Sequence, residues 1–144
     1  MTTDTASERP AATDRGLARG VLVAATPDRV TIAVPGSDYR LDLVPTAPDP
    51  TPVGKRTRGR IDAQALRVHG AAAGGQFIEP VYGAPRIVAG VIADLDPAGN
   101  RLLVRVPVPM WVRPIEGQTI EGFEIGQAVN FYVRSGTTWT PEPV

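Results

Sequence analysis

The sequence predicts an all-β protein made of two tandem, OB-like small β-barrels. Three observations lead there. Gly and Pro each occur 15 times in 144 residues, the apolar residues between them alternate with a period of two, and the same order of segments occurs twice. Proline is poorly tolerated inside helices, and many short strands separated by Gly/Pro turns are typical of barrels and sandwiches.

The first barrel unit is expected over residues 16–69. It follows a polar tail, residues 1–15, which has too few apolar residues to form a core and is expected to be disordered. Within the unit, Val30, Ile32 and Val34 alternate with polar or small neighbours and predict one buried strand face. The expected strands are residues 16–25, 29–34, 39–44, 57–62 and 65–69.

The second barrel unit is expected over residues 86–144, after a Gly/Ala joint and bridging segment at residues 70–85. Leu102, Val104 and Val106 repeat the alternation of the first unit, and so do Val129 and Phe131. The expected strands are residues 86–95, 101–106, 110–115 and 128–134. Residues 137–140 are expected to close this second unit.

An internal duplication is indicated by one alignment of the two halves. Gly20 aligns with Gly90 at an offset of 70 residues, and Gly54 aligns with Gly126 at an offset of 72 after a longer turn. Turns and apolar faces stay in step over more than half of each unit, and such self-similarity is typical of repeated structural units. The sequence leaves open whether the units form separate barrels or one joint, pseudo-symmetric pair.

The shared segments resemble the small barrels of the TOBE and molybdate-pterin-binding (Mop) families. The resemblance lies in 18–21 (Ala-Arg-Gly-Val) with Val53-Gly54, and in Gly90-Val91 with Ile125-Gly126. It implies OB-like barrels that bind oxyanions such as molybdate, or that serve as accessory domains of transporter ATPases. The basic residue expected in the last strand is replaced by Ile61-Asp62, so the resemblance concerns the fold more than the ligand.

The amino-acid composition counts against several classes of function. Lys+Arg and Asp+Glu are both 15, so the net charge is zero, whereas nucleic-acid binders usually carry a basic excess. The chain has no cysteine, which excludes disulfides and thiolate metal sites and favours a reducing, cytoplasmic location. No apolar run is long enough for a membrane span, and the polar N-terminus does not look like a secretory signal.

One basic run is the sharpest local feature of the sequence. If Thr57, Gly59 and Ile61 face the core, the arginines between them share the outer face of a strand. Guanidinium groups on one face could hold phosphates or carboxylates, or could simply protect an edge strand from unwanted pairing. The expected partner-contact residues are Lys55, Arg56, Arg58 and Arg60, with the aromatics Trp111 and Tyr132; Trp111 could instead be a core anchor.

Catalytic, cofactor and metal sites are not expected. The single histidine, His69, has no nucleophile or orienting carboxylate near it as a motif. Asp94 and Asp96 flank the start of a turn, where aspartate commonly caps the backbone, and they lack the other ligands of a calcium loop. No phosphate-binding glycine motif occurs, so the chain is not expected to be an enzyme.

The sequence therefore favours a non-catalytic binding or assembly module that contacts a protein partner or a second copy of itself. Binding of single-stranded nucleic acid or of an oxyanion is the alternative, because OB-like barrels can present basic and aromatic residues together. Residues 1–69 carry a net charge of +2 and residues 70–144 carry −2. Opposite charges on the two halves predict head-to-tail contact, within the chain or between chains.

Overall fold

The computed structural model describes residues 16–71 and 75–142, and within these ranges it contains twelve β-strands and no helix. The predicted all-β class is therefore confirmed. A membrane-spanning helix is correspondingly absent from the described residues. The expected disordered tail, residues 1–15, lies outside the described ranges.

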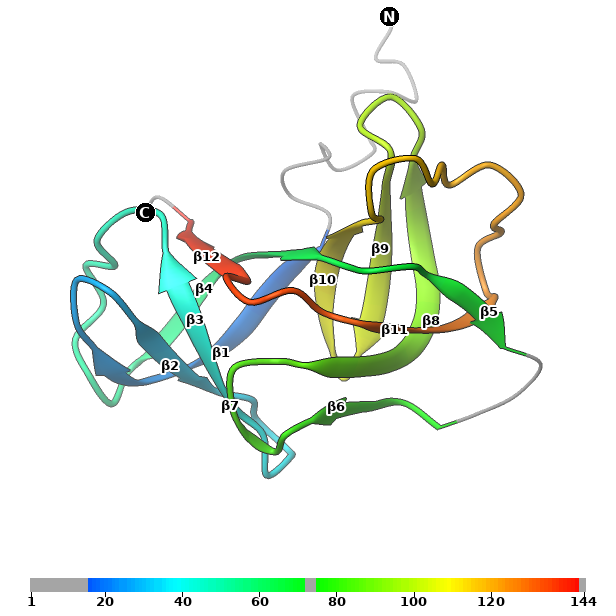
Figure 1. Cartoon of the computed structure of the whole chain (residues 1–144). Helices are drawn as coiled ribbons and strands as arrows, with labels where there is room; N and C mark the ends of the chain where they lie inside the picture. Colours follow the sequence, from blue (N-terminus) through cyan, green and yellow to red (C-terminus); the bar gives the residue numbers. More distant parts are fainter. Residues whose placement is uncertain (1–15, 72–74, 143–144) are drawn as a thin grey trace, which may run out of the picture.

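Five strands close a β-barrel (Figure 1). They are β1 (Leu17–Ala25), β2 (Val30–Ala33), β3 (Arg40–Pro45), β4 (Arg56–Gln64) and β12 (Thr138–Pro141). The hydrogen-bonded order is β1-β2-β3-β12-β4, and β4 returns to pair with β1. The barrel is therefore built from residues 17–64 and from one strand near the C-terminal end, residues 138–141.

The position of β12 corrects the sequence prediction for residues 137–140. That segment was expected to close the second unit, but β12 lies parallel to β3 and antiparallel to β4 in the first barrel. Figure 1 shows it, in red, between the cyan β3 and β4. The physical reason is Trp139, which is completely buried in the core there and would lose its apolar contacts elsewhere.

The remaining strands extend the sheet beyond β4. They are β10 (Val108–Arg113), β9 (Arg101–Val106), β8 (Ile87–Asp96), β11 (Ala128–Tyr132) and β5 (His69–Ala71), in this order. β4 is longer than expected, and its end lies parallel to β10. Residues 65 and 66, expected to begin a separate strand, instead bond to the end of β11 through the Ala65–Val133 bridge and the Leu66 N–H to Tyr132 C=O bond of 2.8 Å.

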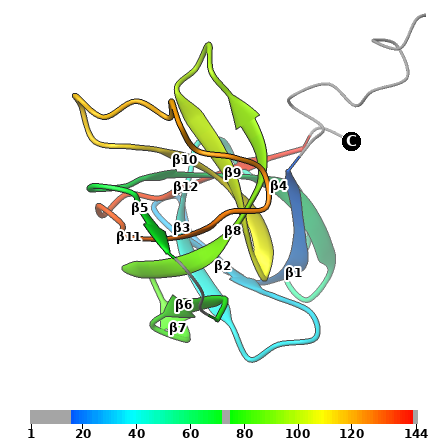
Figure 2. The same ribbon diagram turned by 90° about the vertical axis from the view of Figure 1, so that its right-hand side faces the viewer.

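Two short strands were not predicted. β6 (Phe77–Glu79) pairs with β8, and β7 (Tyr82–Gly83) pairs with β3. Figure 2 shows both at the lower edge of the molecule. The segment that was expected to bridge the two units thus contacts strands from both halves of the sequence.

One core joins ten of these strands, and β5 and β7 contribute no residue to it. Its largest fully buried side chains come from both halves, among them Leu22, Leu41, Phe131 and Trp139. The inward alternation predicted for β2 and β9 is observed, since Val30, Ile32, Leu102 and Val104 are all buried. The residues of β1 and β4 that face away from the core are at the surface and form the candidate site.

Candidate binding groove

The outer face of β1 and β4 carries three arginines. In β4, Thr57, Gly59 and Ile61 are buried, whereas Arg56 and Arg58 are exposed, as the alternation predicted. Arg19 of β1 is also exposed and lies directly opposite Arg58 in the antiparallel pairing. Since directly opposite side chains on one sheet face are close neighbours, the pairing gathers three cations in a small area.

These arginines line a groove of about 770 Å³. The other side chains that line it are mostly apolar or small: Val21, Val34, Pro35, Pro50, Thr51, Thr57, Pro107 and Val108. Glu142, which follows β12, also lies in the lining, and its backbone N–H donates to the Arg58 carbonyl at 3.0 Å. The groove therefore combines an apolar surface with two net positive charges, from three arginines and one glutamate.

The groove arginines keep their charges available. Among residues 16–71 and 75–142, no carboxylate forms an ion pair with Arg19, Arg56 or Arg58. A guanidinium group presents a planar fork of N–H donors that matches carboxylate and phosphate oxygens in a bidentate geometry. The chemistry of this surface is therefore that of an anion-binding site with an apolar component.

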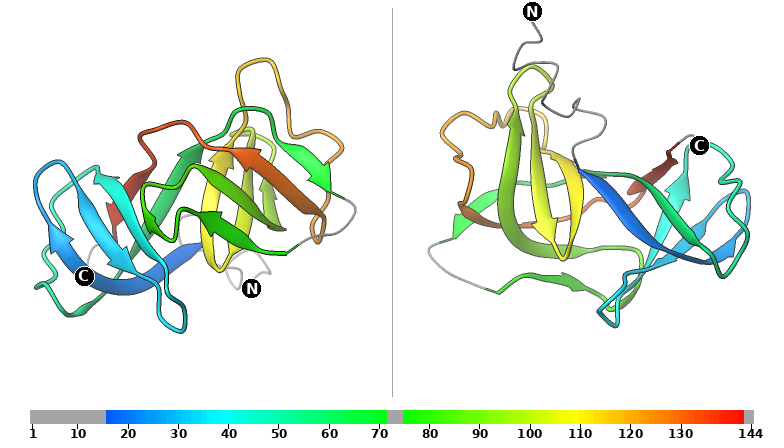
Figure 3. Two further views of the ribbon diagram at one scale, coloured as in Figure 1. Left: turned by 60° about the horizontal axis from the view of Figure 1, so that its bottom comes forward. Right: turned by 180° about the vertical axis from the view of Figure 1, so that it is seen from behind.

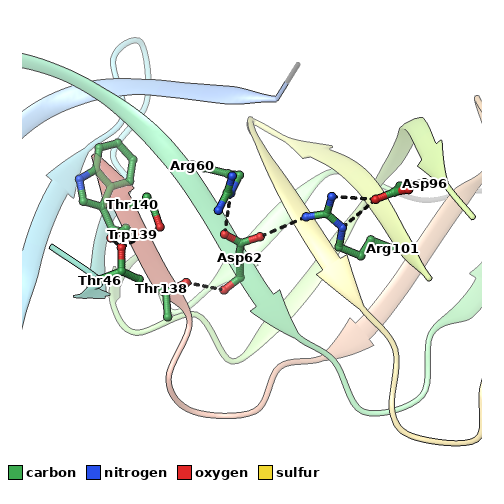
Figure 4. A network of polar contacts seen from close by, with 8 residues as sticks. All are labelled: Thr46, Arg60, Asp62, Asp96, Arg101, Thr138, Trp139 and Thr140. Carbon is green, nitrogen blue, oxygen red and sulfur yellow. Dashed lines mark hydrogen bonds and ion pairs between the residues drawn. The ribbon is translucent and has the colours of Figure 1, made fainter. Parts of the chain in front are cut away.

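Arg60 shares the outer face of β4 but not the groove. Its Nε donates to Asp62 Oδ2 at 2.9 Å, and the other Asp62 oxygen lies 3.8 Å from Arg101 of β9. Arg101 in turn makes a 2.7 Å ion pair with Asp96 (Figure 4). Arg60 is thus part of a network that connects β4 to β9, and it is not one of the free cations.

Trp111 is not a surface contact. Only 1% of its surface is exposed, and the Arg101 guanidinium stacks over its ring at 4.5 Å from the centroid. The expectation that Trp111 contacts a partner is therefore corrected, because a partner could not reach this side chain. Trp111 also lies outside the cluster of side chains that forms the common core, so the core-anchor alternative stays a prediction.

The other predicted contact residues lie outside the groove lining. Lys55 is exposed at the start of β4, next to the groove arginines. Tyr132 is 61% exposed and, with Phe77, lines a separate depression of about 260 Å³ over β8 and β11. The groove arginines and the exposed aromatics Phe77 and Tyr132 therefore line different hollows.

Asp49 fixes one wall of the groove. Its carboxylate accepts hydrogen bonds from the Thr51 N–H, the Thr57 hydroxyl and the Trp139 indole N–H, at 2.9, 2.8 and 3.1 Å. Burial raises the pKa of Asp49, but these hydrogen bonds together outweigh burial and hold its pKa below the ordinary value. The ionised carboxylate thus ties β12 to two groove-lining threonines.

Known proteins give no guide to the ligand. No family model matches the chain, and neither the curated proteins nor the solved structures that were compared with it give a match. The groove must be interpreted from its own chemistry.

The single histidine and the acidic residues do not form a metal-binding cluster in the described ranges. His69 is exposed in β5, and in the described part of the chain no hydrogen bond joins it to a carboxylate or a hydroxyl. Residues 16–71 and 75–142 also contain no group of three or more His, Asp or Glu residues that could hold a metal ion.

Sequence reasoning missed Arg19. It is the only charged residue between Gly16 and Ala25, so no basic run marks it in the sequence. The signal that could have found it is the strand pairing: once β1 is placed antiparallel to β4, Arg19 is opposite Arg58. No sequence pattern indicated the hydrogen bonds of Asp49, because its partner Trp139 is 90 residues away along the chain.

Proposed function

We propose that this protein is a non-catalytic binding module whose β1–β4 groove holds an acidic, extended segment of a protein partner. The observation that carries the proposal is the trio Arg19, Arg56 and Arg58, which has no carboxylate partner in the described residues and lines a partly apolar groove. Carboxylates of the partner would pair with the guanidinium groups. Aliphatic side chains of the partner would bury against the valines and prolines.

The shape and lining of the groove favour a peptide over a nucleic acid. Proteins that bind single strands stack bases on aromatic side chains beside a basic track. The groove lining contains no aromatic residue, and exposed Tyr132 lies in a different depression. Single-stranded nucleic acid is therefore the second candidate, supported only by the three cations, and a small oxyanion would fill little of the volume.

We also propose that the two halves arose by duplication of one OB-like unit. The pairing registers support this. Val21 of β1 pairs with Ala33 of β2, and Val91 of β8 pairs with Arg105 of β9. In both strand pairs the register shifts just after the next residue, Leu22 in β1 and Ile92 in β8. The β1–β4 and β8–β11 registers also match, with Gly20 opposite Thr57 and Gly90 opposite Val129.

The third strands correspond at an offset different from the one that the sequence alignment used. Leu41 faces Ile32, and Met110 faces Val104, so β3 and β10 are related by 69 residues. The chain between the paired positions is three residues shorter in the second unit, 104–110 against 32–41, which accounts for the change from 72. The counterpart of Trp111 is therefore Asp42.

In this proposal the second unit is a barrel that shares β4 with the first. The end of β4 pairs with β10, the Ala65 N–H donates to the Arg113 carbonyl, and the Leu66 N–H donates to the Tyr132 carbonyl. β12 occupies the corresponding place in the first barrel. The arrangement is one joint pair of barrels rather than two independent domains, and the basic groove belongs to the first barrel.

A peptide-binding titration tests the proposed function. The probe is a fluorescein-labelled peptide of about eight residues containing Glu and Val, a length that spans roughly 26 Å when extended. We expect fluorescence polarisation to saturate at low salt and to weaken as salt increases, because screening reduces ion pairing. The double substitution Arg56→Ala with Arg58→Ala is expected to weaken binding at least roughly tenfold.

Matched controls separate the groove from general charge. Arg86→Ala removes an exposed arginine outside the groove lining and is expected to leave the affinity unchanged. An oligonucleotide of equal charge and inorganic molybdate are the competing ligands. Tighter binding of the oligonucleotide than of the peptide would replace the proposal with the nucleic-acid alternative, and competition by molybdate alone would replace it with an oxyanion site.

We also propose that the protein is cytoplasmic and that it is not an enzyme. A cytoplasmic location is supported by the lack of cysteine, because disulfides stabilise many small proteins of oxidising compartments. A binding role is supported by the chemistry of the groove, which offers cations and apolar contacts.

A further inference from the structure

An acidic loop lies in the second half of the sequence, whereas the three groove arginines lie in the first. The segment between β10 and β11, residues 114–127, holds Glu116, Glu121 and Glu124, all exposed. Within the described ranges none of these three carboxylates forms an ion pair. Arg67 flanks the loop beside Glu121, so the three glutamates and this arginine together carry two net negative charges.

The same loop presents an exposed aliphatic side chain. Ile125 is 62% exposed at the second position of a four-residue turn closed by the Gln127 N–H to Glu124 C=O bond of 3.1 Å. Gly126 has φ of 93°, the left-handed conformation that the third position of a type II turn requires. The turn therefore holds Ile125 outward beside Glu124, and acidic and apolar groups project together.

The groove and this loop are complementary in charge and in apolar character. The groove lining carries two net positive charges and several valines and prolines. No residue of the loop lies in the groove lining, and Figures 1 and 3 show the orange loop at the other end of the molecule from β2. The two surfaces cannot meet within one chain.

We infer that the 114–127 loop of one copy docks into the β1–β4 groove of a second copy. This inference rests on the proposed function, since it names the acidic partner segment as this protein's own loop. Glu121 and Glu124 would pair with groove arginines, and Ile125 would bury against the groove valines and prolines. Each copy offers one loop and one groove, so the contact is heterologous and builds a ring or an open chain.

Charge reversal and mixing test the inference on the full chain. One variant combines Arg19→Glu, Arg56→Glu and Arg58→Glu, and the other combines Glu116→Lys, Glu121→Lys and Glu124→Lys. Light scattering and sedimentation at low salt measure the mass over a range of concentrations. We expect the wild type to associate, and each variant alone to associate at least roughly tenfold more weakly, because its groove and loop then carry like charges.

Mixing the two variants is the decisive step. In an equimolar mixture each groove again meets a loop of opposite charge, so we expect association to return to near the wild-type level. Circular dichroism and thermal unfolding are used to check that both variants are folded. The matched control Arg86→Glu with Glu79→Lys changes exposed charges on or next to β6 and β8, and we expect it to associate like the wild type.

Three results would overturn the inference. They are a wild type that is monomeric at every concentration, variants that associate as strongly as the wild type, and a mixture that stays monomeric. The peptide titration described above stays informative in each case. If the peptide binds the groove while the wild type is monomeric, the groove binds a different acidic partner; if neither occurs, the proposed function fails too.

Discussion

Replacement of Trp139 by alanine tests whether β12 closes the first barrel. Trp139 is fully buried, and a buried aromatic of this size removes about 150–250 Å² from water, which corresponds to about 4–6 kcal/mol. Alanine retains a small part of this, so the free energy of unfolding is expected to fall by about 3–5 kcal/mol. Trp139→Phe keeps most of the apolar area but loses the bond to Asp49, and is expected to cost about 1–2 kcal/mol.

Urea unfolding gives these values, and hydrogen exchange locates the damage. The Val44 and Thr46 amides donate to the Thr137 and Trp139 carbonyls, both at 2.9 Å, so Trp139→Ala should deprotect them first. Tyr132→Ala, on an exposed side chain, is the control and should change stability by less than about 0.5 kcal/mol. A loss below about 1 kcal/mol for Trp139→Ala, with unchanged protection of Val44 and Thr46, would refute the placement of β12.

Other substitutions test individual contacts by the same unfolding assay. A Cβ at Gly20 or Gly90 would lie 2.7 Å from a backbone oxygen of the adjacent strand, so alanine at either should cost about 1–3 kcal/mol, whereas Gly75→Ala, in open space, should cost little. The pKa of Asp49 is lowered in the folded state, so its ionised form stabilises the fold above its unfolded pKa of about 4. This contribution is lost as the pH falls through the folded pKa. Asp49→Asn should therefore make the free energy of unfolding less dependent on pH at the acid end. Arg101→Gln, which removes the two hydrogen bonds from the guanidinium Nε and Nη2 to Asp96 Oδ2, should cost about 1–3 kcal/mol, and Arg101→Lys somewhat less.

Strand positions were predictable because local patterning determines them. The alternation of Val30 and Ile32, and of Leu102 and Val104, places one face of each strand in the core, and a one-residue shift would expose that face. Turn chemistry at Pro27 and Pro97 separates the strands. The outer face of β4 followed from the same rule, which is why Arg56 and Arg58 were correctly expected at the surface.

Strand partners were not predictable from the same signals. The large apolar side chain of Trp139 predicts a buried position, but nothing in residues 137–140 indicates that this position is beside β3 and β4. The buried state of Trp111 likewise depends on Arg101 covering its ring, a contact between two strands. Arg60 carries the same residue type and alternation as Arg58, and only the neighbouring Asp62 and Arg101 remove it from the free cations.

The central claim is that the β1–β4 groove binds an acidic peptide, and an amide chemical-shift titration tests it most directly. The uniformly labelled protein is titrated with the Glu/Val peptide at low salt. We expect the amides of Arg19, Arg56 and Arg58 to shift together and to saturate, while the amide of Tyr132 stays unchanged. Shifts centred on Tyr132 and Phe77, or no saturable shift along β1 and β4, would contradict the claim.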